Sequence, residues 1–107
     1  MTTVAFYFED ELLSGFHIVG HSTANAEDEL GRIVCSAVSS AAYMTANTIT
    51  EIVGARAEIS VNEERGEMTL ILKDGFEDSF NIMSGFMLHI KQLSNQYPDY
   101  IALTTEV

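Results

Sequence analysis

Two residues with the chemistry of nucleophilic catalysis lie in residues 20–39, which join a strand-like segment to a helix-like one. The only cysteine of the chain, Cys35, follows His21 across a polar loop. A cysteine attacks as the thiolate, and the ordinary pKa of its thiol is about 8.5. The positive end of a helix stabilises that anion, and a neighbouring imidazole can take the proton. The pattern therefore indicates Cys35 as a nucleophile and His21 as its general base.

Two other interpretations of these residues were weighed. Buried cysteines with no chemical role are common, so Cys35 can also be read as a core residue. A metal site would use His17, His21 and Cys35, but in an extended strand the two histidines lie about 13 Å apart and cannot share one ion. The sequence has no Cys-x-x-Cys or His-Glu-x-x-His spacing and no glycine-rich phosphate loop. We therefore expect no metal and no cofactor.

The segment that carries the cysteine is predicted to be a helix from about Arg32 to Val53, with Gly54 as its stop. Side chains with apolar surface recur there at helical spacing, namely Val34, Val38, Ala41, Thr45, Ile49 and Ile52. This prediction puts Cys35 in the first turn and Ser39, four residues later, on the same face. Residues 22–31 lack an apolar period and are predicted as a loop, with at most one turn of helix, that folds over a substrate.

The other segments show strand and helix patterns in a simple order. The predicted elements are strands at 2–8 and 15–19, the helix at 32–53, strands at 57–61 and 68–72, a helix at 80–97 and a strand at 101–105. Both hairpins require antiparallel pairing. We therefore expect residues 1–107 to form one two-layer α+β domain, with an antiparallel or mixed sheet and both helices on one face.

The chain is acidic, with 5 Lys and Arg against 16 Asp and Glu and a formal net charge of −11. Such a surface repels phosphate backbones and anionic lipids, so we expect neither nucleic-acid nor membrane binding. A basic protein is the natural partner, although acidity also serves solubility alone. One cysteine cannot form an internal disulfide and residues 1–9 lack a signal-peptide pattern, so a cytoplasmic protein is predicted.

Gly20-His21, followed by the run I-V-C-S-A-V-S at residues 33–39, resembles the ribosomal-processing cysteine protease family called Prp. The resemblance extends over essentially the whole chain, through the second helix with H-I-K-Q-L-S-N-Q-Y-P to the closing strand. It implies a homodimeric α+β domain in which His21 is the general base and Cys35 the nucleophile. It also implies a substrate, because this family removes a short N-terminal extension from a basic large-subunit ribosomal protein in bacteria, after a hydrophobic, aromatic-rich segment.

Arg32 departs from this family, many of whose members have an acidic residue three positions before the cysteine. One helical turn from Cys35, its guanidinium could instead stabilise the thiolate. The carboxylates that remain to orient the histidine are Glu27, Asp28 and Glu29.

The predicted reaction is hydrolysis of a peptide bond through an acyl-enzyme. The backbone N–H groups of Cys35 and Ser36, at the predicted helix start, are expected to stabilise the oxyanion. The residues predicted to bind substrate are Gly20, Arg32, Ser36 and Ser39. The alternative function is a non-catalytic acidic homodimer that binds a basic ribosomal or assembly partner, an interpretation that Arg32 keeps open.

Overall fold

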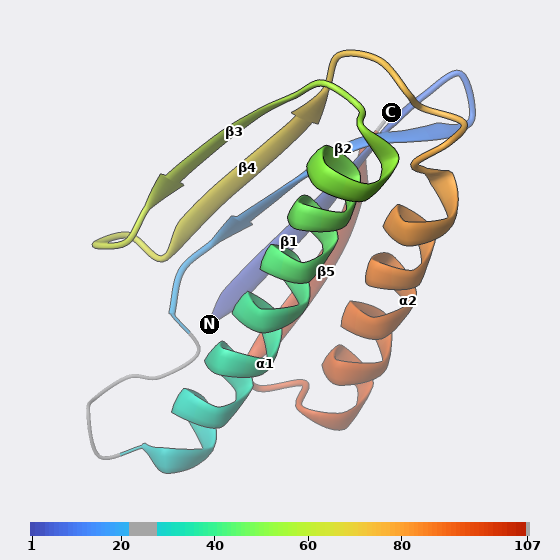
Figure 1. The fold of residues 1–107 in the computed structure, drawn as a ribbon. Helices are drawn as coiled ribbons and strands as arrows, with labels where there is room; N and C mark the ends of the chain where they lie inside the picture. The colour runs from blue at the N-terminus through green and yellow to red at the C-terminus, as the bar shows by residue number, and fades with distance from the viewer. Residues whose placement is uncertain (22–27, 107) are drawn as a thin grey trace.

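The computed structural model describes residues 1–21 and 28–106. These residues form one five-stranded sheet, two α-helices and a short π-helix (Figure 1). The elements in chain order are β1 (Thr2–Glu9), β2 (Leu12–Val19), α1 (Glu29–Asn47), η1 (Thr48–Val53), β3 (Ala57–Asn62), β4 (Glu67–Leu72), α2 (Phe80–Gln96) and β5 (Ile101–Glu106). The predicted order of strands and helices is therefore confirmed. Most of the predicted loop, residues 22–27, lies outside the described residues.

The sheet has the strand order β3-β4-β2-β1-β5. The hairpins β1–β2 and β3–β4 are antiparallel, β2 pairs antiparallel with β4, and β5 runs parallel to β1. The sheet is therefore mixed, within the predicted two-layer α+β class. Because β2 and β4 are neighbours, the end of β2 at Val19 comes next to the turn that joins β3 to β4 (Figure 1).

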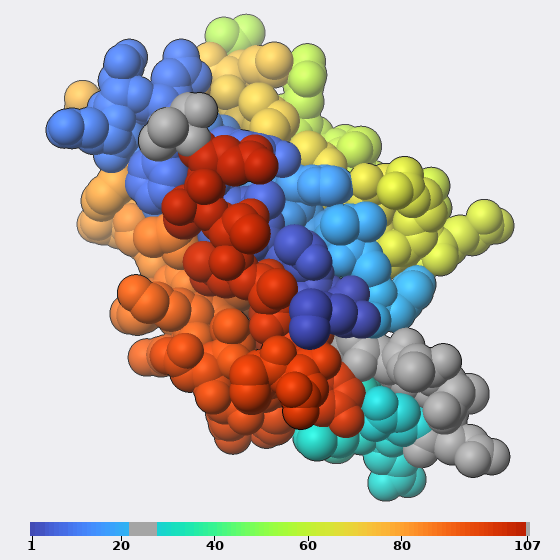
Figure 2. Space-filling model, turned by 180° about the vertical axis from the view of Figure 1, so that it is seen from behind, coloured from blue at the N-terminus to red at the C-terminus, as the bar shows by residue number. Residues whose placement is uncertain are grey.

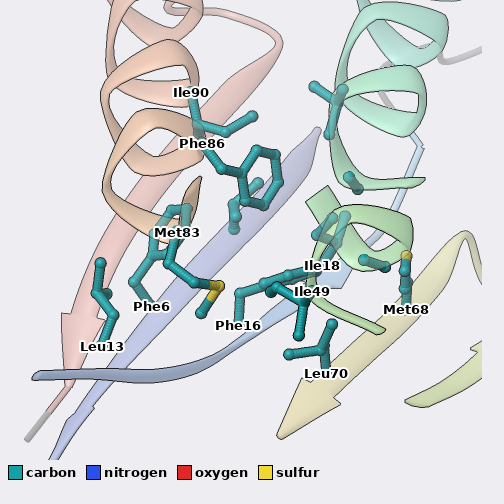
Figure 3. Close-up of a cluster of buried hydrophobic side chains, with 14 of the residues drawn as sticks. Phe6, Leu13, Phe16, Ile18, Ile49, Met68, Leu70, Met83, Phe86 and Ile90 are labelled. Carbon is teal, nitrogen blue, oxygen red and sulfur yellow. The ribbon is translucent and has the colours of Figure 1, made fainter. Parts of the chain in front are cut away.

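The hydrophobic core lies between the sheet and the two helices, both of which cover one face (Figure 1). Figure 3 shows Phe6 and Phe16 from the first hairpin pointing toward Phe86 of α2. The ring centroids of Phe16 and Phe86 are 4.9 Å apart and the ring planes make an angle of 66°, which is a favourable edge-to-face arrangement. This packing holds β1 and β2 of the first hairpin against α2.

The opposite face of the sheet has no helix over it among the described residues, and Figure 2 shows β5, β1 and β2 at the molecular surface there. His17 lies on this face, because its neighbours Phe16 and Ile18 point into the core and side chains alternate along a strand. Within the described ranges, no helix has the length and apolar character needed to cross a membrane.

The start of α1 differs from the predicted one. The helix begins at Glu29 rather than near Arg32, because the Asp28 side chain caps it by accepting a hydrogen bond from the Gly31 N–H at 2.9 Å. The end of the polar run, which was predicted as a loop with at most one turn of helix, therefore supplies the first turn of α1. As a consequence, Cys35 lies in the second turn and not in the first.

The end of the predicted helix is also altered, although the stop at Gly54 is as expected. The last six residues, Thr48–Val53, wind as the wider π-helix η1. Threonine hydroxyls donate to carbonyl oxygens four residues earlier around this change, from Thr45 to Ala41 and from Thr48 to Met44, both at 2.8 Å. Such bonds compete with the backbone ladder and are typical of places where a helix changes its winding.

Candidate active site

A cavity of about 260 Å³ lies between α1, the end of β2 and the β3–β4 turn. His21 and Cys35 both line it, together with Gly20 and Ser39. The fold therefore brings together four residues that the sequence pattern singled out. Much of the remaining wall is apolar and consists of Ile18, Val38, Ala42, Val61 and Met68.

Cys35 reaches the cavity from the side of α1 that borders the core. Its side chain is half-buried and its thiol is free. Ser39 lies one turn further along the same face, as predicted, and also lines the cavity. The thiol and the Ser39 hydroxyl therefore open onto the same space.

The backbone around Cys35 does not provide the oxyanion donors that were predicted. The Arg32 N–H already donates to the Asp28 carbonyl oxygen at 3.1 Å, so the ladder of α1 is established before Cys35. The N–H groups of Cys35 and Ser36 lie in the interior of α1, where each donates to the carbonyl oxygen four residues earlier. The prediction of an oxyanion hole at these two groups is wrong, because it assumed a later helix start.

Gly20 bends the chain out of β2 and turns His21 toward the cavity. Its φ of +97° is left-handed, and an added Cβ would lie 2.4 Å from the Met1 carbonyl oxygen. Only glycine fits both requirements without strain. The Gly20 N–H also donates to the Arg65 carbonyl oxygen at 3.2 Å, which ties this bend to the β3–β4 turn.

The imidazole of His21 is held by the β3–β4 turn, residues 62–67. Its Nε2 lies 3.2 Å from the carbonyl oxygen of Glu64. The predicted carboxylate partners are placed differently: Asp28 caps α1, Glu29 is exposed in the first turn, and Glu27 lies outside the described residues. The partner of the histidine that the structure describes is thus a backbone carbonyl, which sequence reasoning missed.

Arg32 and Ser36 lie on the exposed side of α1. Among the residues that the structure describes, neither belongs to the lining of the cavity. The structure thus separates these two from Gly20 and Ser39, although all four were predicted to bind substrate.

His17, the third residue of the metal interpretation, is engaged on the outer face of the sheet. Its Nε2 lies 2.8 Å from a carboxylate oxygen of Glu67, and Arg65 lies 3.3 Å from the other oxygen. The hydrogen bond from His17, with a smaller contribution from the Arg65 charge, lowers the pKa of Glu67 below its usual value. No cluster of three or more potential metal ligands occurs within residues 1–21 and 28–106.

Comparison with known proteins gives a consistent family assignment. The sequence profile described as "Cysteine protease Prp" matches residues 1–102. The chain belongs to the cysteine protease Prp family. The resemblance drawn from residues 20–21 and 33–39 is therefore confirmed, and membership in the Prp family makes the protein a cysteine protease. No curated protein matches it by sequence.

Solved structures share the fold of this Prp family member at low sequence identity. The ribosomal processing protease Prp from S. aureus, in complex with a substrate peptide, is 19% identical with a TM-score of 0.86, over 98% of this chain and 99% of that one. The structure of the same enzyme with a covalently linked product peptide is 20% identical in sequence, with a TM-score of 0.87 and the same coverage of both chains. A protein from Streptococcus mutans is 19% identical with a TM-score of 0.88, over 99% of this chain and 94% of its own.

Proposed function

We propose that this protein is an endopeptidase that removes a short N-terminal extension from a large-subunit ribosomal protein, with Cys35 as nucleophile and His21 as general base. The observation that carries the proposal is that the only cysteine of a Prp-family chain lines the same cavity as His21. The substrate class is supported by the S. aureus structures, which are of a ribosomal processing protease with a substrate peptide and with a covalently linked product peptide.

The proposed reaction has two chemical stages. His21 takes the proton of the Cys35 thiol, and the sulfur forms a bond to the scissile carbonyl carbon. The C–N bond then breaks while the imidazolium of His21 returns its proton to the leaving amine. Water, deprotonated by His21, attacks the resulting thioester and releases the acid and the thiol. The Ser39 hydroxyl, on the same side of α1, is positioned at the cavity to donate a hydrogen bond to substrate oxygens.

The character of the cavity supports a hydrophobic or aromatic residue next to the cut. Tyr43 and Val61 are 46% and 47% exposed, and both line the cavity, so its mouth has an apolar rim. The formal net charge of −11 supports attraction of a basic chain from further away. A basic protein with an aromatic segment before the cut combines both features.

We also infer that the protein is a homodimer. Support comes from large apolar side chains on the outer side of α1 and η1, where Ile33 is 62%, Met44 56% and Ile52 80% exposed. Light scattering coupled to size-exclusion chromatography should give twice the chain mass of 11.8 kDa. A mass of one chain at micromolar concentration would contradict the dimer.

The test of the proposed function is cleavage of a peptide that spans the extension junction of the host bacterium's own ribosomal protein, followed by mass spectrometry. The parent should make one cut, while Cys35→Ala should make none and His21→Ala should be slower by about 10²–10⁴-fold. Ser36→Ala and His89→Ala are matched controls, because both residues are exposed and Ser36 adjoins Cys35 without lining the cavity. Binding of the peptide without cleavage would favour the non-catalytic module.

A further inference from the structure

The β3–β4 turn, residues 62–67, meets the end of β2 at three points. The Gly20 N–H donates to the Arg65 carbonyl oxygen, the Glu64 carbonyl oxygen lies 3.2 Å from His21 Nε2, and Gly66 packs beside the imidazole. The turn is also closed by bonds of its own, since Asn62 Oδ1 accepts from the Arg65 N–H at 3.3 Å. The contacts to His21 are therefore additional to those that form the hairpin.

The contact with Glu64 determines which nitrogen of His21 carries hydrogen. A carbonyl oxygen has no hydrogen to donate, so Nε2 must be the donor in this bond. In a neutral imidazole the other nitrogen, Nδ1, then has the free lone pair. Within the proposed reaction, Nδ1 is thus the atom that takes the proton of the Cys35 thiol.

Gly66 keeps the Nδ1 edge of the ring clear. An added Cβ at this position would lie 2.9 Å from Cε1 and 3.0 Å from Nδ1 of His21, and 2.7 Å from the Gly20 carbonyl oxygen. A Cβ atom essentially never lies within 3.0 Å of a non-bonded heavy atom from elsewhere in the chain, so the ring or the Gly20 bend would have to move. A side chain at position 66 would therefore shift the imidazole, either directly or through the Gly20 bend that carries His21.

We propose that the β3–β4 turn is a positioning device for the catalytic base: the Glu64 carbonyl fixes the Nε2–H tautomer of His21, and the absence of a side chain at Gly66 leaves room for the ring beside its Cε1 and Nδ1 atoms. This inference rests on the proposed roles of His21 and Cys35. It adds Glu64, through its backbone carbonyl, and Gly66, which also lines the cavity, as residues that position His21.

The first test compares Gly66→Ala with Gly54→Ala. Both glycines have a left-handed φ, +60° and +78°, so alanine strains the backbone similarly at each. A Cβ on Gly54 would meet nothing within 4 Å, whereas one on Gly66 meets His21. We expect kcat to fall by about 100-fold in Gly66→Ala, with KM little changed and with no comparable fall in Gly54→Ala. Equal kcat in the two variants would overturn the proposal.

Gly66→Asn separates backbone strain from collision with the ring. Asparagine tolerates a left-handed φ better than alanine, yet it carries the same Cβ against the imidazole. The Asn variant should therefore be more stable to urea than Gly66→Ala and should still lose kcat. Recovery of the parent kcat would mean that Gly66 serves only the shape of the turn.

The second test does not depend on turnover. Long-range ¹H–¹⁵N spectra of the imidazoles in Cys35→Ala should show His21 as the Nε2–H tautomer, against the exposed His89 as an internal reference. In Cys35→Ala with Gly66→Ala, the His21 signals should shift toward a mixture of tautomers while those of His89 stay the same. A predominant Nδ1–H form in Cys35→Ala would overturn the proposal even if the parent cuts its peptide. The predicted tautomer in a parent without activity would instead refute the proposed function alone.

Discussion

The two helices cover the same face of the sheet, yet they bury different kinds of side chain (Figure 1). The buried residues of α2 are large: Met83, Phe86 and Ile90. Those of α1 are mostly small: Gly31, Val34, Val38, Ala42, Thr45 and Ala46. Large side chains fill the space down to the sheet, whereas the short ones of α1 leave a cavity beside Cys35. The comparison indicates that α2 provides stability, while the small side chains of α1 leave the space in which the proposed reaction would take place.

The strongest test of this division is Phe86→Ala on α2. Phe86 is 3% exposed and contacts Phe6 and Phe16, so removal of its ring should cost about 3–5 kcal/mol of the free energy of unfolding. Cleavage per folded molecule should stay near that of the parent. Urea denaturation measures the first effect, with Leu88→Ala, an exposed residue of the same helix, as control. A loss of kcat in fully folded Phe86→Ala would contradict the division.

The complementary change on α1 is Ala42→Leu, which adds bulk to the wall of the cavity. We expect a cost of about 1–3 kcal/mol in stability and a large rise in KM, because the side chain occupies substrate space. Ala37→Leu is the control, since Ala37 is on the same helix but is not part of the lining. Peptide cleavage over a range of substrate concentrations separates KM from kcat. An unchanged KM in Ala42→Leu would show that the cavity does not receive substrate.

The strands and both helices were predicted from the types and the spacing of their apolar residues, two residues for a strand and 3.6 for a helix. This signal does not depend on burial, since β3 was also found although none of its residues is buried. The start of α1 was missed because Asp28, its cap, stands in a polar run that gives no apolar signal. The neighbours of His21 were missed for another reason. Glu64 and Gly66 reach it only because β2 pairs with β4, a contact between distant segments that local patterns do not report.

The caps of the two helices give the next prediction. Asp28 accepts from the Gly31 N–H at the start of α1, while the Ser79 hydroxyl at the start of α2 is buried without a hydrogen-bond partner among the described residues. Asp28→Ala should therefore cost about 1 kcal/mol of stability. Ser79→Ala should be neutral or slightly stabilising, because it removes an unsatisfied buried hydroxyl. Urea denaturation midpoints of the two variants measure this difference in stability. An equal loss of stability in both variants would contradict the prediction.

The smallest expected effect concerns the link between the two helical segments. Arg56, between η1 and β3, donates from its backbone N–H and its Nε to the two carboxylate oxygens of Asp74, in the connection from β4 to α2, both at 2.7 Å. The backbone bond first, and the guanidinium second, hold the pKa of Asp74 below its usual 3.8. The folded state thus favours the ionised carboxylate.

This shift sets the direction of the pH dependence. A carboxyl group whose pKa is lower in the folded state stabilises the fold above its usual pKa, and this contribution disappears as the pH falls through the folded value. At neutral pH Asp74→Asn should therefore unfold at slightly lower urea than the parent, and the two midpoints should converge below about pH 3.8. Asp78→Asn, an exposed carboxylate in the same connection, is the control. The effect should be small because the Arg56–Asp74 pair is largely exposed, so solvent and salt weaken it. A difference between the two urea midpoints that persists at low pH would mean that Asn at position 74 is disfavoured for reasons other than charge.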